Sequence, residues 1–156
     1  MTQLEFLMSL RKLLPFTTLC LIACGPDLPD NWSNAEEIVD FTQSMCQGSP
    51  DDEPQDKELE AMKDESSIVV LYNNVTLNCD TEIEGFQQVD GNTISVLLQP
   101  EDMNPSGRSK CICLYDFEFV IPNITSGSYE VELFWRKDNT QENNEPFFID
   151  SISIDN

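Results

Sequence analysis

The chain has 156 residues, of which 40 % are hydrophobic, and carries a formal net charge of −21. This length suits one domain of ordinary size, and the negative charge argues against a nucleic-acid partner, whose phosphates it would repel. Histidine, the commonest general base and transition-metal ligand, is absent. The chain also lacks Gly-x-Ser-x-Gly and a glycine-rich phosphate loop. We therefore expect no enzymatic activity, no catalytic residue, no cofactor and no resident metal.

Residues 1–23 are expected to be an export signal. A short basic pair precedes the apolar run 13–23. That run is much shorter than the ~20 residues needed to span a bilayer, but it is typical of a secretory signal. Met1 and Met8 both remain open as the start of translation, and Met8 gives the more compact signal.

The signal ends in Leu21-Ile22-Ala23-Cys24, followed by Gly25. This sequence resembles the lipobox of bacterial lipoproteins. The resemblance implies cleavage before Cys24, lipidation of its sulfur, acylation of the new amino terminus, and a stable lipid (palmitate-type) anchor in the membrane. Glycine after the cysteine implies the outer membrane of the cell envelope, with the periplasmic or surface side left open. A plain secretory signal is the alternative.

Residues 24–66 are expected to form a flexible acidic tether with one short helix near 34–45. Ser33 provides a helix cap with acidic residues in the first turn. The apolar residues recur at helical spacing: Ile38, Phe41 and Met45. The stretch 47–65 is rich in Asp, Glu, Pro and Ser and lacks the Asp-x-Asp-x-Asp-Gly spacing of a calcium loop, so it is interpreted as a solvated spacer.

Residues 67–156 are expected to form an all-β domain, an antiparallel β-sandwich of six to seven strands. The strongest signal is 110–121, where the odd positions are all apolar or aromatic and the even positions include Lys110, Asp116 and Glu118. A second long alternation covers 129–136. Shorter strand-like runs cover 68–72, 75–79, 83–89, 93–98 and 147–154.

A hairpin is predicted around Asp90-Gly91-Asn92, which separates two of these runs. We prefer a three-residue loop that pairs Phe86 with Val96. This register places Phe86 on the same face as the apolar residues of the following strand.

The segment 119–131 is similar to the corner before the sixth strand of immunoglobulin-like and fibronectin type III-like domains. The resemblance implies an immunoglobulin-like sandwich in which the Tyr129 hydroxyl turns back to bond the corner backbone. An ordinary core tyrosine at a strand start is the alternative. The Cys–Trp–Cys order of immunoglobulin domains is not present.

Four cysteines follow Cys24: Cys46, Cys79, Cys111 and Cys113. In an exported chain they predict two disulfides. Cys111 and Cys113 lie ~6.6–7 Å apart along one strand, near the upper limit for a bridge, so each is expected to pair elsewhere. Two pairings remain open: Cys79–Cys111 with Cys46–Cys113, or Cys79–Cys113 with Cys46–Cys111.

The cysteine-bearing segments 78–80 and 111–116 also resemble small bacterial lipoproteins of unassigned activity. We expect a membrane-anchored lipoprotein whose disulfide-stapled sandwich is a binding or structural module. The loops 99–109, which include Arg108, and 138–146 are the expected contacts for a protein or glycan partner. The alternative is a thiol-based copper or redox carrier that uses Cys111 and Cys113.

Overall fold

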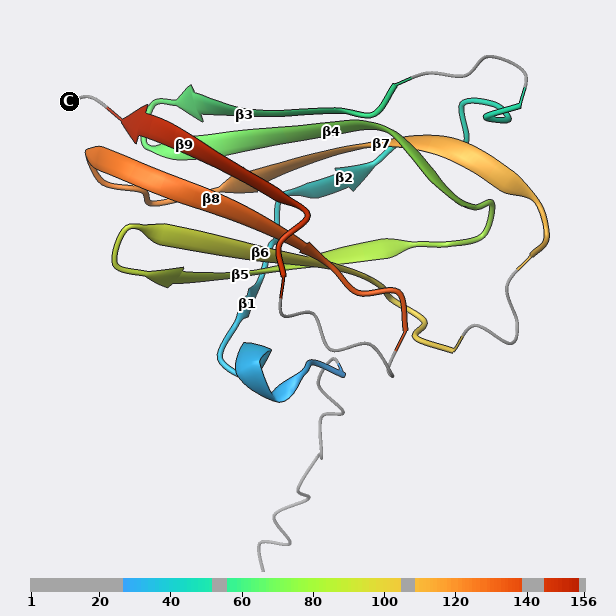
Figure 1. Ribbon diagram of the computed structural model, residues 1–156, viewed down its shortest axis with the longest axis horizontal. Helices are drawn as coiled ribbons and strands as arrows, with labels where there is room; N and C mark the ends of the chain where they lie inside the picture. Colours follow the sequence, from blue (N-terminus) through green and yellow to red (C-terminus); the bar gives the residue numbers. More distant parts are fainter. Residues whose placement is uncertain (1–26, 52–55, 105–108, 139–144, 155–156) are drawn as a thin grey trace, which may run out of the picture.

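The computed structural model describes residues 27–51, 56–104, 109–138 and 145–154. They form two β-sheets packed face to face (Figure 1), which confirms the predicted all-β sandwich. The helical structure in these ranges is a single 3₁₀ turn, η1 (Asp30–Trp32), and none of it is long and apolar enough to cross a membrane. The predicted export signal, Cys24 and Arg108 lie outside the described residues.

One sheet has five strands in the order β1-β5-β6-β8-β9, and the other has four in the order β2-β7-β4-β3. The first contains β1 (Glu36–Glu37), β5 (Ile83–Asp90), β6 (Thr93–Pro100), β8 (Gly127–Trp135) and β9 (Phe148–Ile154). The second contains β2 (Phe41–Gln43), β7 (Ile112–Ile121), β4 (Ser67–Asn78) and β3 (Glu58–Asp64). Neighbouring strands are antiparallel except β6 and β8, which are parallel.

The main core lies between the sheets, and the alternation on β7 contributes five of its buried residues. The inward residues of β7 are at most 4 % exposed: Cys113, Tyr115, Phe117, Phe119 and Ile121. They face fully buried residues of the five-stranded sheet: Ile94, Val96, Leu98, Val131 and Leu133. Each such side chain contributes roughly 1.5–3 kcal/mol on burial, so the packing of these two faces stabilises the sandwich.

The two runs predicted at 68–72 and 75–79 form one strand, β4, with a β-bulge between Tyr72 and Val75. Asn74 adopts a left-handed φ of 60°, which asparagine tolerates better than most residues. Its backbone N–H donates to Asp116 Oδ1 at 2.9 Å. Asn73 and Asn74, which lie between the two predicted runs, therefore bend the strand and do not end it.

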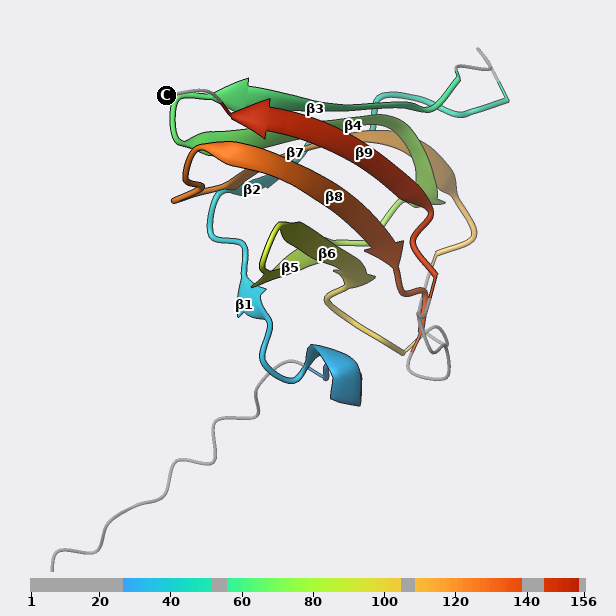
Figure 2. The same cartoon turned by 60° about the vertical axis from the view of Figure 1, so that its left-hand side comes forward.

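A second, smaller core covers the outer side of the five-stranded sheet. Its buried members are Trp32, Phe86, Leu97 and Phe134. Trp32 packs edge-on against Phe134, with ring centroids 5.3 Å apart. Figure 2 shows η1 lying below β5 and β6, on the side away from the four-stranded sheet. The chain just after the predicted lipidation site is therefore part of the fold.

This second core explains why the predicted hairpin register is wrong by one residue. The loop is Gly91-Asn92, Asp90 pairs with Thr93, and Phe86 pairs with Leu97 instead of Val96. Phe86 therefore faces outward toward Trp32, whereas Val96 faces the main core. The prediction assumed that this hairpin has one buried face, but both faces are covered.

The predicted helix over 34–45 is also wrong. This segment forms β1 and β2, which belong to different sheets. Ile38, 3 % exposed, and Phe41 enter the main core, but Met45 is 89 % exposed, so the three residues do not share one apolar face. Since β3 lies within 24–66 as well, the sandwich begins well before residue 67.

The Tyr129 hydroxyl does reach back to the predicted corner. It lies 2.9 Å from Thr125 Oγ1. Its partner is thus a side chain of the corner, whereas the resemblance implied a backbone group.

Candidate functional site

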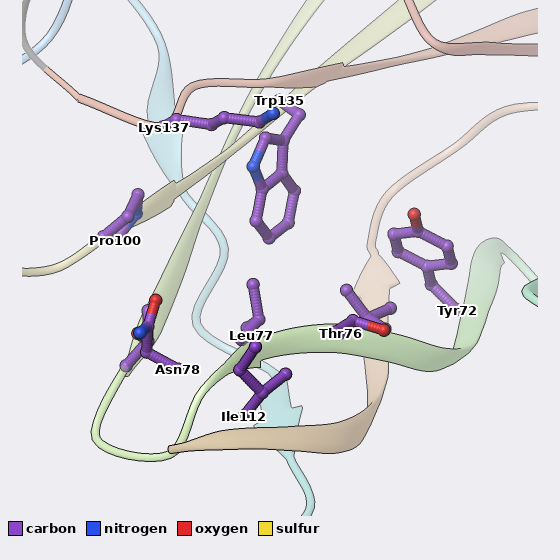
Figure 3. A pocket seen from close by; sticks show the side chains of 10 residues that line it. Tyr72, Thr76, Leu77, Asn78, Pro100, Ile112, Trp135 and Lys137 are labelled. Atoms are coloured by element: carbon purple, nitrogen blue, oxygen red, sulfur yellow. The ribbon is translucent and has the colours of Figure 1, made fainter. Parts of the chain in front are cut away.

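An apolar pocket of about 270 Å³ opens at one end of the sandwich, between β4 and the end of β8 (Figure 3). The Trp135 indole points from β8 toward Leu77 of β4 and Ile112 of β7, and Tyr72 closes the far side. Burial raises the pKa of the Tyr72 phenol, which keeps this wall of the pocket uncharged.

The pocket forms where the main core stops short of the strand ends. Leu98 and Leu133 are fully buried, but Trp135, two residues further along β8, is only partly buried. Ile112 begins β7 and is 51 % exposed. The apolar alternation of β8 therefore continues to Trp135, one inward position beyond the part of the core that is filled from both sides.

The rim of the pocket is polar. It includes Thr76, Asn78 and Lys137, and Figure 3 shows the Lys137 side chain extending toward Trp135. The Asn78 amide already donates to the Ser109 carbonyl. An apolar floor with a small polar rim suits an apolar group that enters from solvent.

The four cysteines form two disulfides beside this pocket. Cys46 pairs with Cys113 and Cys79 with Cys111, with Cα–Cα distances of 5.4 and 5.5 Å. This is the first of the two pairings that the sequence left open. Since β7 lies between β2 and β4, the bridges hold its first residues to both neighbours.

The two disulfides touch each other. Cys79 Sγ lies 2.8 Å from Cys113 Sγ, and the sulfurs of Cys46, Cys79 and Cys113 all lie within 4.8 Å of one another. The short contact is not a hydrogen bond, because both sulfurs are already in disulfides and carry no proton. Thiolates bind metals, so a metal at this cluster would require prior reduction.

Tyr115 and Asp80 fix the turn that carries Cys79. The Tyr115 hydroxyl donates to the Cys79 carbonyl at 2.7 Å. Burial, and to a smaller extent the charge of Asp80, raise the pKa of Tyr115, so the hydroxyl keeps its proton at neutral pH. Asp80 accepts the Ser109 N–H, at 2.9 Å for Oδ2.

A buried polar network holds the N-terminal segment near the same end of the sandwich. Arg136, 4 % exposed, donates to the Asp27 carbonyl and to Gln99 Oε1. Gln99 in turn donates to Glu84 Oε1 at 2.8 Å. Burial raises the pKa of Glu84, the bond from Gln99 opposes this shift, and the charges of Glu101 and Glu37 add to it.

The two loops expected to meet a partner begin at the pocket. Pro100 lies at the start of the loop 99–109, Lys137 directly precedes the loop 138–146, and both residues line the pocket. Trp135, Leu77 and Ile112 were not predicted as site residues, because each lies in a strand-like pattern. The available signal was that Ile112 falls on the face of its strand that also carries Asp116 and Glu118, and that Trp135 ends its strand before a polar loop.

Comparison with known proteins finds no family model, curated protein or solved structure that matches this chain. The fold and the bridges define a β-sandwich module held by two disulfides. No closer identification follows from similarity, so function rests on the residues themselves.

Proposed function

We propose that the protein is a lipid-anchored lipoprotein of the bacterial cell envelope that binds a protein partner through the pocket beside Trp135. The single observation that carries the binding role is the apolar pocket at the start of both candidate loops. The anchor rests on the lipobox at Cys24.

The N-terminal network suggests how the sandwich would sit on a membrane. Two residues, Gly25 and Pro26, separate Cys24 from Asp27, and the three residue steps between them span at most about 11 Å. Arg136 holds Asp27 against the sandwich, so a lipid on Cys24 would keep this end of the domain close to the bilayer. Lys137 lines the pocket and directly follows Arg136. The partner is therefore expected at the membrane surface.

The pocket favours a protein over a glycan. Its volume of about 270 Å³ lies just below the range of small-molecule sites and fits one large apolar side chain of the kind that anchors protein interfaces. One N–H of the Asn78 amide, a polar group that a sugar would need, already donates to the Ser109 carbonyl. With a net charge of −21, the domain should prefer an anchor flanked by Lys or Arg.

Short peptides test this preference. We expect the acetylated, amidated tripeptide Lys-Trp-Lys to shift the NMR signals of the Trp135 indole N–H and the Ile112 methyls in a saturable way. Lys-Ala-Lys lacks the anchor and Glu-Trp-Glu reverses the flanking charge, so each should bind at least about tenfold more weakly, or ~1.4 kcal/mol. Equal binding of all three peptides, or shifts produced only by sugars, would contradict the proposal.

A pair of matched variants locates the site. Ile112 and Ile149 are similarly exposed, at 51 % and 54 %, but only Ile112 lines the pocket. Ile112→Lys should abolish Lys-Trp-Lys binding, whereas Ile149→Lys adds the same charge and should leave it unchanged. If both variants bind like the wild type, the peptide binds elsewhere.

A second candidate is a thiol-based copper or redox carrier, which the sequence suggested at Cys111 and Cys113. One observation favours it, the close cluster of the Cys46, Cys79 and Cys113 sulfurs, which includes Cys113 but not Cys111. Both residues are oxidised in this structure, so Cu(I) would bind only after reduction. Native mass spectra with Cu(I), recorded before and after reduction, test it. Retention of one Cu(I) by the reduced chain alone supports this candidate, and no retention by either form contradicts it.

A further inference from the structure

We propose that the two disulfides form one exchange site for external thiols. In this exchange the inner sulfurs, those of Cys79 and Cys113, become a new bridge, and the outer sulfurs, those of Cys46 and Cys111, become free thiols. The inference is independent of both the lipid anchor and the pocket.

The topology places Cys113 between two cysteines with which it can pair. It lies on β7, with β2 on one side and β4 on the other. It is bonded to Cys46, which follows β2, and its sulfur lies 2.8 Å from that of Cys79, which follows β4. Cys79 and Cys111 both lie just outside the regular strands, where the backbone can adjust to a new bridge.

Exposure separates the four sulfurs into an outer and an inner pair. Cys46 and Cys111 are exposed, whereas Cys79 is partly buried and Cys113 is only 4 % exposed. An external thiolate must reach the sulfur that it attacks. It will therefore attack an outer sulfur, and an inner sulfur will be the leaving group.

Attack at Cys46 gives a balanced sequence. The external thiolate bonds to Cys46 Sγ, the Cys46–Cys113 bond breaks, and Cys113 leaves as a thiolate. This thiolate attacks the adjacent Cys79 Sγ, a Cys79–Cys113 bond forms, and Cys111 leaves as a thiolate that takes a proton from water. A second external thiol then resolves the mixed disulfide, which yields an external disulfide and a thiol at Cys46.

Attack at Cys111 leads to the same product. In that case Cys79 is the leaving group, and its thiolate attacks Cys113 and releases Cys46. Both routes place the free thiols at exposed positions and leave the buried Cys113 sulfur in a covalent bond. A buried thiolate is poorly solvated, so we expect this arrangement to be preferred over simple loss of either native bridge.

The test is partial reduction of the folded, exported chain with about one equivalent of dithiothreitol per protein. Acid quenching and N-ethylmaleimide mark the first thiols, and full reduction with iodoacetamide then marks the rest. Fragmentation of the peptides distinguishes Cys111 from Cys113. Because each cysteine is observed separately, the state of Cys24 does not affect the result.

We expect the two-thiol species to carry maleimide on Cys46 and Cys111. Reaction with a sulfur already in contact should outpace a second external attack, so the maleimide ratio of Cys111 to Cys113 should exceed about ten. Maleimide on Cys46 with Cys113, or on Cys79 with Cys111, means independent reduction and overturns the proposal. Absence of any two-thiol species also overturns it.

A double variant provides a second measurement. Cys46→Ser with Cys111→Ser leaves only the inner pair, which we expect to oxidise to a disulfide in the folded chain. The matched control, Cys79→Ser with Cys111→Ser, retains the native Cys46–Cys113 pair and should oxidise as well. If the inner-pair variant folds by circular dichroism but keeps two free thiols while the control closes, the proposal is wrong.

Discussion

Replacing Trp32 with alanine should destabilise the whole sandwich, although this residue lies in the segment that the sequence suggested was a tether. Trp32 is 1 % exposed and packs against Phe86, Leu97 and Phe134. The substitution removes the centre of the second core. If this core is part of the cooperative unit, its loss must lower the free energy of unfolding of the entire domain.

The expected loss is about 3–4 kcal/mol. A buried tryptophan removes roughly 200 Å² from water, which at ~25 cal/mol/Å² corresponds to about 5 kcal/mol. Residual burial in the unfolded chain reduces this value by ~10–40 %. The result agrees with the range of about 3–5 kcal/mol for large-to-small substitutions in protein cores.

Urea unfolding followed by far-UV circular dichroism measures this loss. With a slope of ~2 kcal/mol/M, the midpoint should fall by about 1.5–2 M. Trp32→Phe should cost less than half as much, because it keeps an aromatic ring and removes the buried Nε1–H, which has no hydrogen-bond partner. Val39→Ala, at a position 90 % exposed, is the control and should leave the midpoint unchanged. A Trp32→Ala midpoint within about 0.3 M of wild type would refute the second core.

Three further predictions concern the buried polar network and the bridges. Arg136→Met should lower the free energy of unfolding by about 2–3 kcal/mol, because it removes charge-assisted hydrogen bonds; an unchanged urea midpoint would contradict this. Replacing Cys46 and Cys113 with alanine opens a loop of 67 residues and should cost about 4 kcal/mol in the chain-entropy model, again read from the midpoint. The raised pKa of Glu84 favours the folded state at low pH, and this contribution is lost as the pH rises from the ordinary value of 4.5 through the raised value. Glu84→Gln should therefore raise the urea midpoint more at pH 7 than at pH 4. The exposed control Glu130→Gln should change the midpoint equally at both pH values. An equal effect of Glu84→Gln at the two pH values would contradict the expected direction.

Strand periodicity was a reliable guide where a strand is long and has one buried face. In β7 every second residue from Cys113 to Ile121 is buried, as the alternation predicted. Strand periodicity gave the wrong register in the β5–β6 hairpin, because both faces of this hairpin are covered. Phe86 is buried in the second core, on the side that was assumed to face solvent. Parallel pairing of β6 with β8 joins strands distant in sequence, and no local pattern indicates such a pairing.

The N-terminal segment could not be predicted for a related reason. The strands β1 and β2 have only two and three residues. Such short strands cannot show a period of two. Ile38 and Phe41 are three apart, so their spacing fits a helix as well as a chain that crosses between sheets. Trp32 lies among Asp, Asn and Pro, and only the three-dimensional structure brings it to Phe134.

The cysteines were identified from the sequence, but their pairing was not. Cys111 and Cys113 were expected on one face of one strand, so parity could not distinguish their partners. Their partners, Cys46 and Cys79, lie on opposite sides of β7. Which cysteine pairs with which therefore depends on the order of the strands in the sheet. The pocket was missed because the limit of a core depends on where the facing sheet ends, and the sequence of one strand does not contain that information.

The measurement that tests the central claim most directly is the mass of the N-terminal peptide of the full-length protein, expressed in a bacterium and extracted from its membranes. If the protein is lipid-anchored as proposed, the chain begins at Cys24 and carries a thioether-linked lipid and an acylated amino group. An unmodified Cys24, cleavage at another residue, or a retained N-terminus at Met1 or Met8 would contradict the lipid anchor and the proposed position of the sandwich at the membrane.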